Sequence, residues 1–317
     1  MIAFLFPGQG SQQVGMGREL AAAFPVARQT FEEADAAFGP VDGPRLSDLC
    51  FHGPEDRLQL TEITQPAILA ASIAACRVLA AHGVLPNVVA GHSLGEYSAH
   101  VAAGTFAFAD AVAIVRRRGR YMQEAVPVGT GAMVAILGAS LELVQRACDE
   151  AAAGEVVSPA NINGPGQIVI AGTTAAVARA SARARELGAR RAVPLPVSAP
   201  FHCALMKPAE DRLAPALRAL AVRPPRVPVV ANVDAAPKGD GAAAIDALVR
   251  QIAAPVRWEQ VVRRLASDGV TTYVEVGPGT VLGGLVKKIH AGASILHFGS
   301  PEELETVLAA CSISAEK

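Results

Sequence analysis

Charged and aromatic side chains are scarce in this chain. Of its 317 residues, 18% are Asp, Glu, Lys or Arg and 4% are Phe, Trp or Tyr. The formal net charge is −1, so the overall positive field typical of nucleic-acid-binding proteins is missing. Hydrophobic residues reach 51%, which excludes a disordered chain and is typical of an α/β protein with closely packed helices.

Cysteine is infrequent as well. The five cysteines, Cys50, Cys76, Cys148, Cys203 and Cys311, are scattered and odd in number, and none forms a Cys-x-x-Cys pair. Disulfide frameworks and zinc sites need paired or closely spaced cysteines. We therefore expect reduced thiols, no metal and a cytoplasmic protein.

Long uninterrupted apolar runs are also missing. The first ten residues, MIAFLFPGQG, have no basic residue before a short apolar run and do not fit a signal peptide. The uncharged stretches 78–95 and 156–178 are interrupted by Gly, Pro or Asn. We expect no membrane span and no membrane partner.

Apolar segments alternate with amphipathic ones through most of the chain, which predicts α/β architecture. Strands are expected at 2–6, 87–91, 227–233, 272–277 and 295–299, and helices at 17–38, 66–83, 96–104, 206–220 and 258–269. Ser300 and Glu303 have the spacing of a helix capping box.

The stretch 128–198 differs from the rest in its order of elements. Strands are expected at 131–137, 156–162, 167–172 and 192–197, with helices at 141–153 and 175–188. This β-α-β-β-α-β order is ferredoxin-like. It predicts a small subdomain at 128–198, inserted into a larger subdomain formed by 1–127 and 199–317.

Ser93 lies in the sequence Gly91-His92-Ser93-Leu94-Gly95, between an expected strand and an expected helix. In that context a Gly-x-Ser-x-Gly motif forms a sharp turn that exposes the serine hydroxyl. A serine needs a base to act as a nucleophile, and a nearby helix N-terminus stabilises a developing oxyanion. We interpret Ser93 as a nucleophile; the alternative is a tight turn with an incidental serine.

His202 is the histidine that we favour as the base. It lies on a Pro-bounded loop where the chain leaves the expected small subdomain, and such loops often carry function. His290, near a helix end, and His297, within an expected strand, are alternatives. The spacing of His92, Glu96 and His100 resembles a metal-binding helix face, but packed or solvated helix residues are the favoured interpretation.

Arg118 interrupts an apolar stripe on the helix predicted around it. At about 100° per residue it lies within about 40° of one line together with Ala111, Val115, Met122 and Ala125. A buried guanidinium needs a partner, and no acidic residue shares the stripe. Arg118 therefore forms a structural ion pair elsewhere or binds the carboxylate of a ligand.

Two further groups of residues have simpler interpretations. Arg116, Arg117 and Arg120 are expected on a solvated basic face. The glycine-rich stretches PGQGSQ and GPGTVLGG lack the Lys-Ser/Thr pair of a phosphate-binding loop, and we interpret both as close-approach turns. The first follows a strand and could supply an N–H group to an oxyanion.

Taken together, these motifs resemble the malonyl-CoA:acyl-carrier-protein transacylases of fatty acid synthesis over nearly the whole chain. The matching stretches, in the family order, are FPGQGSQ, TQPAILA, GHSLGEYSA, RGRYMQEAVPVGTGAM, NGPGQIVIAG, FHCALMKPA, PVRW and VEVGPG. The resemblance implies an α/β-hydrolase-like large subdomain beside the ferredoxin-like one, and a monomer.

The resemblance also implies the roles of individual residues. Ser93 would carry the acyl group, with His202 as its base and the backbone carbonyl of Gln251 orienting that base. Arg118 would hold the free carboxylate of the malonyl group. The remaining implied site residues are Gln9 and Leu94 as oxyanion-hole N–H donors, Phe201 as a residue that favours malonyl over methylmalonyl, and Asn161 near the active site.

The reaction implied is transfer from malonyl-CoA to the phosphopantetheine thiol of acyl carrier protein through a malonyl-serine, without a cofactor. A separate acyltransferase that loads polyketide synthase carriers would share all these residues. An acyl-carrier editing hydrolase and a non-catalytic carrier-docking module compete with the transferase interpretation. Arg118 argues against a simple esterase, and the intact Ser93 and His202 argue against a docking module.

Overall fold

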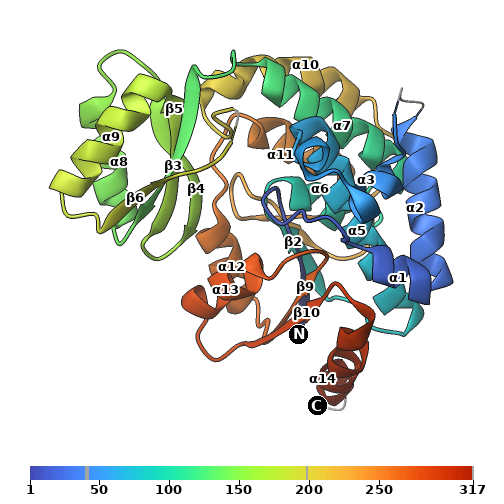
Figure 1. The fold of residues 1–317 in the computed structure, drawn as a ribbon. Helices are drawn as coiled ribbons and strands as arrows, with labels where there is room; N and C mark the ends of the chain where they lie inside the picture. The colour runs from blue at the N-terminus through green and yellow to red at the C-terminus, as the bar shows by residue number, and fades with distance from the viewer. Residues whose placement is uncertain (40–42, 198, 316–317) are drawn as a thin grey trace.

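Two separate sheets organise the molecule, as a computed structural model that describes residues 1–39, 43–197 and 199–315 shows (Figure 1). The larger sheet has six strands in the order β10-β9-β1-β2-β7-β8. They are β1 (Ile2–Phe6), β2 (Val88–Gly91), β7 (Val229–Val230), β8 (Pro237–Lys238), β9 (Thr272–Val276) and β10 (Ser294–Phe298). All neighbouring pairs are parallel except β7 with β8, which confirms the predicted α/β class.

Helices cover both faces of the large sheet. Successive residues of β1 point to opposite faces: Phe4 and Phe6 belong to one hydrophobic cluster, Ala3 and Leu5 to another. The first cluster includes residues of α2 (Pro25–Phe38), α5 (Thr61–Ala81) and α7 (Phe108–Glu124), and the second those of α12 (Trp258–Ser267) and α13 (Val281–Ile289). A sheet buried on both faces explains the continuous apolar runs of its strands.

The other helices of the large part complete these layers. They are α1 (Arg18–Ala23), α3 (Leu46–His52), α4 (Glu55–Leu58), α6 (Leu94–Ala102), α10 (Lys207–Arg218), α11 (Gly241–Gln251) and α14 (Leu304–Ala315), with short 3-10 helices at Ala204–Met206 and Pro301–Glu303. The capping box predicted at Ser300 and Glu303 is present.

The smaller sheet is antiparallel and lies to one side of the large part (Figure 1). Its strands are β3 (Gly131–Leu137), β4 (Val157–Gly164), β5 (Gln167–Thr173) and β6 (Arg191–Pro194), in the order β4-β5-β3-β6. The two helices α8 (Leu141–Ala151) and α9 (Thr174–Glu186) bury the same core as these strands. The predicted β-α-β-β-α-β order is therefore confirmed. The expected boundary falls at Ser198, which lies outside the described residues.

Three predicted boundaries are wrong for local reasons. The helix expected at 17–38 breaks at Phe24, whose backbone is extended (φ −122°, ψ 121°) because Pro25 follows it. Helix α5 begins at Thr61 rather than at Pro66, since the N–H groups of Ile63 and Thr64 both donate to Leu60. The strand expected at 227–233 shortens to two residues.

Helix α5 is the one described helix that is long and apolar enough to cross a membrane by length and composition. Of its most apolar window, 83% is buried inside this fold, as in the core helix of a globular protein. It packs against α2 and α7, so its apolar character is explained by protein contacts.

Candidate active site

Ser93 lies on a sharp turn between β2 and α6, in the left-handed half of backbone space at φ 52° and ψ −104°. Glycine flanks it because the chain segments touch there. A Cβ atom on Gly91 would lie 2.0 Å from the backbone of Gly95, and one on Gly95 would lie 2.0 Å from the carbonyl oxygen of Phe6. The Gly-x-Ser-x-Gly pattern therefore follows from packing, and it holds the serine in a strained conformation.

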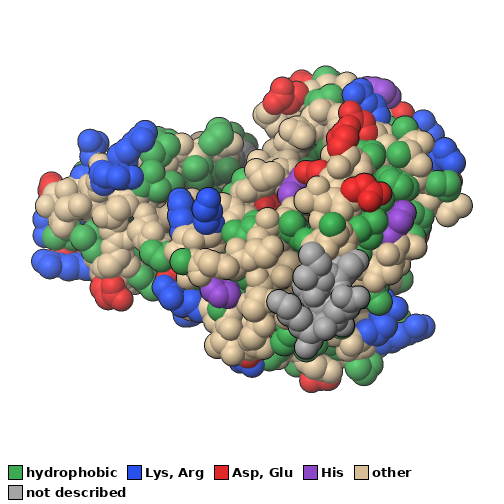
Figure 2. Space-filling model, turned by 90° about the horizontal axis from the view of Figure 1, so that it is seen from below, with side chains coloured by type: hydrophobic (Ala, Val, Ile, Leu, Met, Phe, Trp, Pro, Cys, Tyr) green, Lys and Arg blue, Asp and Glu red, His purple; other side chains and the backbone are tan. Residues whose placement is uncertain are grey.

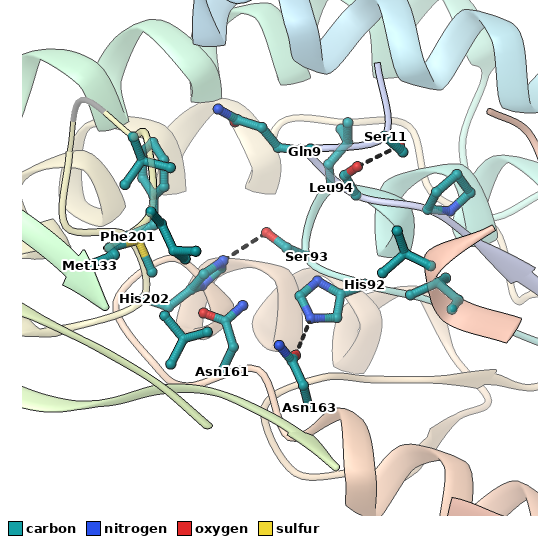
Figure 3. A pocket seen from close by; sticks show the side chains of 18 of the residues that line it. Gln9, Ser11, His92, Ser93, Leu94, Met133, Asn161, Asn163, Phe201 and His202 are labelled. Carbon is teal, nitrogen blue, oxygen red and sulfur yellow. Dashed lines mark hydrogen bonds between the residues drawn. The ribbon is translucent and has the colours of Figure 1, made fainter. Parts of the chain in front are cut away.

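His202 faces Ser93 across the site (Figure 3). Its Nε2 lies 2.7 Å from the Ser93 Oγ, and its Nδ1 lies 2.9 Å from the backbone carbonyl oxygen of Gln251. A carbonyl can only accept, so Nδ1 carries the proton and Nε2 is free to accept the hydroxyl proton of Ser93. A backbone carbonyl thus occupies the place that a carboxylate holds in a Ser-His-Asp triad.

Burial keeps His202 neutral. Its side chain is 3% exposed. Loss of hydration, followed by the positive charge of Arg118, lowers the pKa of His202 to about 3. An unprotonated imidazole can accept a proton at neutral pH, as a general base must.

Two backbone N–H groups beside Ser93 are available to a ligand. Leu94 begins α6, where the first N–H groups of a helix lack partners inside the helix. Neither Leu94 nor Gln9 donates its N–H to any acceptor within the three described segments. Both residues line the pocket around Ser93, on the side away from His202 in Figure 3.

Arg118 is 1% exposed and reaches the nucleophile from α7. Its Nη2 donates to the Ser93 Oγ and to the Gln251 Oε1, each at 3.0 Å, and its Nη1 donates to the Gln65 Oε1 at 2.9 Å. The guanidinium also lies 5.3 Å above the ring of Tyr97. These partners are neutral, and no ion pair of Arg118 occurs within the part of the chain that the structure describes; the Glu96 carboxyl acts on its charge through space, without a direct contact.

The residues that contact Arg118 decide between its two predicted roles, a structural ion pair and the binding of a ligand carboxylate. Burial lowers the pKa of Arg118, but arginine remains charged under ordinary conditions. A buried positive charge held only by amides and a hydroxyl attracts an anion. The geometry therefore favours a carboxylate-binding arginine over a structural ion pair.

A cavity of about 290 Å³ opens around Ser93 between the two parts of the molecule. The large part contributes Gln9, Leu94, Arg118, Phe201 and His202, and the small sheet contributes Met133, Asn161, Asn163, Gln167 and Val169. All eight predicted site residues are thus placed: seven line the cavity, and Gln251 touches His202 and Arg118 from behind it. Figure 3 shows Asn161 beside His202 and Phe201 on the same side of the pocket.

Sequence reasoning assigned no place in the site to four polar residues, although it considered one of them, Glu96, as part of a metal-like helix face. Gln65 accepts from Arg118; the Asn232 Oδ1 accepts from the N–H of Ser93 at 2.7 Å. Glu96 accepts from Gln251, and Asn163 lies 2.8 Å from the His92 ring. Asn232 is 139 residues from Ser93, and no local pattern could join them.

The metal-like spacing on α6 does not converge on one point. The His92 ring contacts Asn163, Glu96 contacts Asn232 and Gln251, and the His100 Nδ1 lies 3.1 Å from the Thr105 hydroxyl. All three are packed side chains, as favoured. The described residues contain no group of three metal-ligating side chains.

Among the remaining predictions, one is wrong. Arg116 does not lie on a solvated basic face: its guanidinium stacks on the Phe38 ring at 4.1 Å and donates to the Phe38 carbonyl, so that the side chain is only partly exposed. Arg117 and Arg120 are exposed as expected. His290 contacts Tyr273 and His297 contacts Glu303, and neither histidine lines the cavity.

The chain is similar to known proteins along nearly all its length. The family model described as "Acyl transferase domain" matches residues 3–294. A malonyl CoA-acyl carrier protein transacylase of Escherichia coli strain K12 is 54% identical over 288 residues, 90% of this chain and 92% of that protein. One of Bacillus subtilis strain 168 is 47% identical over 308 residues, 97% of this chain and 96% of that protein.

Solved structures agree with this similarity. An acyl carrier protein S-malonyltransferase from Vibrio cholerae superposes with a TM-score of 0.94 at 49% identity, covering 96% of this chain and 99% of that chain. A malonyl-transacylase in complex with a type II PKS acyl-carrier protein also gives 0.94 at 49% identity, covering 98% and 99%. Both the elements and their arrangement are therefore shared with these proteins.

Proposed function

This chain belongs to the acyl transferase domain family, and from that membership we propose that it is an acyl-carrier-protein S-malonyltransferase. It transfers a malonyl group from malonyl-CoA to the phosphopantetheine thiol of acyl carrier protein, supplying fatty acid synthesis. The single observation that carries the proposal is Arg118, a buried guanidinium without an ionic partner among the described residues, 3.0 Å from the hydroxyl of Ser93. An arginine placed there selects an acyl group that ends in a carboxylate.

The first half-reaction loads the enzyme. The Nε2 of His202 takes the hydroxyl proton of Ser93, while the Oγ attacks the thioester carbonyl carbon of malonyl-CoA. The N–H groups of Gln9 and Leu94 hold the oxyanion. When the tetrahedral intermediate collapses, the C–S bond breaks and the proton on His202 passes to the departing CoA sulfur. A malonyl ester remains on Ser93, with its carboxylate on Arg118.

The second half-reaction runs in reverse. His202 takes the proton of the carrier's phosphopantetheine thiol, and the sulfur attacks the ester carbonyl. Collapse of the intermediate breaks the bond to the Ser93 Oγ, which recovers the proton from His202. The backbone carbonyl of Gln251 orients the imidazole in both halves. No step needs a metal or a redox cofactor, because each is an acyl or proton transfer.

The cavity lining supports the choice of acyl group. Phe201, next to the base, is 7% exposed and lines the cavity, where its ring would crowd a substituent on the α-carbon. This favours malonyl over methylmalonyl. Asn161 comes from β4 and lies in the same wall, near His202.

A second candidate for the carrier has a specific observation behind it. The complex of a similar malonyl-transacylase with a type II PKS acyl-carrier protein shows that an enzyme of this fold can serve polyketide carriers. The acyl chemistry on Ser93 would be the same. Rates with carriers of the two kinds, measured side by side, separate the pathways.

Mass spectrometry of the intact protein tests the proposal. Malonyl-CoA alone should leave one malonyl group on Ser93, and phosphopantetheinylated acyl carrier protein should then discharge it. Ser93→Ala should take up no malonyl group. Rapid release of free malonate without carrier would instead identify an editing hydrolase and overturn the transferase proposal.

The remaining expectations concern the setting of the enzyme. We propose a cytoplasmic monomer, in keeping with unpaired cysteines throughout the described chain. Figure 2 shows several Lys and Arg side chains over the small-sheet end of one face, whereas the other end carries both acidic and basic side chains. Two subdomains with the predicted bounds, one on either side of the cavity, fit the division between the two sheets.

A further inference from the structure

The buried carboxyl of Glu96 lies behind the catalytic pair, on the first turn of α6, and has no part in the reaction as described so far. It is 0% exposed. Its Oε2 accepts two hydrogen bonds, from the backbone N–H of Asn232 at 2.9 Å and from the Gln251 Nε2 at 2.7 Å. Burying a carboxyl is costly, so its presence needs a reason.

Each partner of Glu96 holds a reacting group. Asn232 accepts from the N–H of Ser93 at 2.7 Å through its Oδ1 and donates to the Gly91 carbonyl at 2.7 Å through its Nδ2. These two bonds join both ends of the turn that carries the nucleophile. The backbone N–H of Asn232 is in turn held by Glu96.

Gln251 joins the other groups. Its side-chain Nε2 also donates to the Ser93 carbonyl at 3.0 Å, and its Oε1 accepts from Arg118 at 3.0 Å. Its backbone carbonyl accepts from His202 at 2.9 Å. One buried residue thus touches the nucleophile, the base and the arginine, and Glu96 fixes which way its amide points.

We propose that Glu96 is a positioning residue for malonyl transfer, which holds Gln251 and Asn232 so that Ser93, His202 and Arg118 keep one relative arrangement. The inference rests on the proposed function for its substrate, but the contacts that it invokes are within the protein. It concerns placement and not contact with the acyl group, since Glu96 is fully buried and does not line the cavity.

The ionisation of Glu96 adds a measurable effect to the proposal, a dependence of malonyl-CoA binding on pH. Loss of hydration raises the pKa of Glu96 to about 7, opposed by its hydrogen bonds from Asn232 and Gln251. The charged or titratable groups that face it are Arg118 on α7, Asp234 after β7 and Tyr97 on α6. Above pH 7 the negative charge of an ionised Glu96 would offset part of the positive charge of Arg118. The binding of the malonyl carboxylate by Arg118 would then be weaker.

Two substitutions separate geometry from charge. Glu96→Leu keeps the volume but removes the acceptor, leaving the N–H of Asn232 and the amide of Gln251 unsatisfied. Glu96→Gln keeps an acceptor for both donors and cannot ionise. His100→Gln is the matched control, because His100 is equally buried one turn along the same helix and contacts Thr105 instead of the site.

The measurements are the rate of Ser93 labelling by a fluorophosphonate, which needs no malonyl group, and the KM and kcat for malonyl-CoA and acetyl-CoA from pH 6 to 8. We expect Glu96→Leu to slow labelling and malonyl loading by about 100-fold, as for a misplaced reacting group. In Glu96→Gln both rates should stay within a few-fold of those of the unchanged enzyme.

The pH dependence tests the charge of Glu96. In the unchanged enzyme and in His100→Gln, the KM for malonyl-CoA should rise with pH, while the KM for acetyl-CoA should not. In Glu96→Gln the KM for malonyl-CoA should no longer rise with pH.

Normal labelling in Glu96→Leu, or an equal loss in Glu96→Gln and Glu96→Leu, would overturn the proposal. If Glu96→Leu does not fold, Glu96→Asp takes its place, because the shorter side chain withdraws the acceptor from Asn232 and Gln251; normal labelling in Glu96→Asp refutes the positioning role. Failure of the proposed function looks different, because the unchanged enzyme would then react with the fluorophosphonate but take up no malonyl group.

Discussion

At the scale of single residues, the site is defined by the buried positive charge of Arg118, which has no ion-pair contact among the described residues. Arg118 is held by Gln65, Gln251 and Ser93, none of which carries a charge at neutral pH. We expect the carboxylate of an incoming acyl group to form the ion pair that Arg118 lacks. We therefore expect selectivity for malonyl to depend on the charge of Arg118 more than on the shape of the cavity.

Replacing Arg118 with Ala should abolish this selectivity. Loss of the partner of a buried carboxylate costs several kcal/mol, so malonyl loading of Ser93 should fall by about 100-fold or more. Acetyl loading should be retained or improved, because acetyl has no carboxylate to leave unpaired. Intact mass spectrometry after exposure to each acyl-CoA measures both. Undiminished malonyl loading would remove Arg118 from the proposed role.

Sequence reasoning at this scale worked where a residue carried its own local signal. Ser93 was marked by two glycines that packing requires, and Arg118 by its place in an apolar stripe. The local sequence of His202 indicated only that it lies on a loop. Its role as the base was implied mainly by the family resemblance. Asn232 and Glu96 could not be found, because their importance comes from contacts between distant segments.

At the scale of elements, the close approach of α5 and α7 places Arg118 beside Gln65. Gly119 makes that approach possible: a Cβ atom there would lie 2.5 Å from the carbonyl oxygen of Thr61. The neighbouring glycine motif at β2 and α6 works in the same way. In both places a glycine brings two backbones together and so sets where a functional side chain stands.

Gly119→Ala should push α7 away from α5. The added methyl group meets backbone, which cannot rotate aside, so unfolding free energy should drop by about 1–3 kcal/mol. The shift should also separate Arg118 from Gln65 and raise KM for malonyl-CoA more than for acetyl-CoA. Thermal unfolding and steady-state kinetics measure the two effects.

Gly284→Ala provides the control for that prediction. Gly284 lies within α13, and a Cβ atom there would have no neighbour within 4 Å. Removing a helical glycine should stabilise the protein by about 0.5–1 kcal/mol. Equal destabilisation by the two substitutions would contradict the packing argument for Gly119.

Element order was largely predictable, and element ends were not. The two sheets and the ferredoxin-like order followed from apolar periodicity, which the buried faces of strands and helices impose. The start of α5 was misplaced because Pro66 resembles a helix beginning, whereas the first turn forms on Leu60. Strand β7 proved short because only Val229 and Val230 pair with β2 within the expected segment.

At the scale of the whole molecule, the fold buries several histidines in the neutral form. Burial lowers the pKa of His100 and of His202 to about 3, and lowers that of His92. Each histidine would take up a proton near pH 6.5 in the unfolded chain. Folding therefore excludes protons from three sites at once.

Stability should decrease as the pH falls below 6.5. Between pH 6.5 and about 3 the unfolded state binds more protons, so each buried histidine removes up to about 1.4 kcal/mol per pH unit. Glu96, with its pKa raised to about 7, acts in the opposite direction between pH 7 and 4.5, because there the folded state binds the extra proton. Burial also raises the pKa of Glu275, which acts in the same direction as Glu96. We expect the three histidines to outweigh these two carboxyls.

Urea unfolding from pH 5 to 7 measures how the free energy of unfolding depends on pH. The variant His100→Gln shows how much one histidine contributes to that dependence. The variant should lose stability at pH 7 but show a shallower decline toward pH 5 than the unchanged protein. A parallel decline would mean that His100 does not contribute to the acid sensitivity.

The bond from His202 to the backbone of Gln251 has a genetic consequence. Every amino acid carries a main-chain carbonyl, so no missense change in codon 251 deletes the acceptor that orients the imidazole. The same codon specifies the amide side chain that holds Arg118 and Glu96, and a single base change can remove it. Spontaneous variants at this position should therefore loosen Ser93 and Arg118, which the amide side chain holds, while His202 keeps the acceptor that orients it.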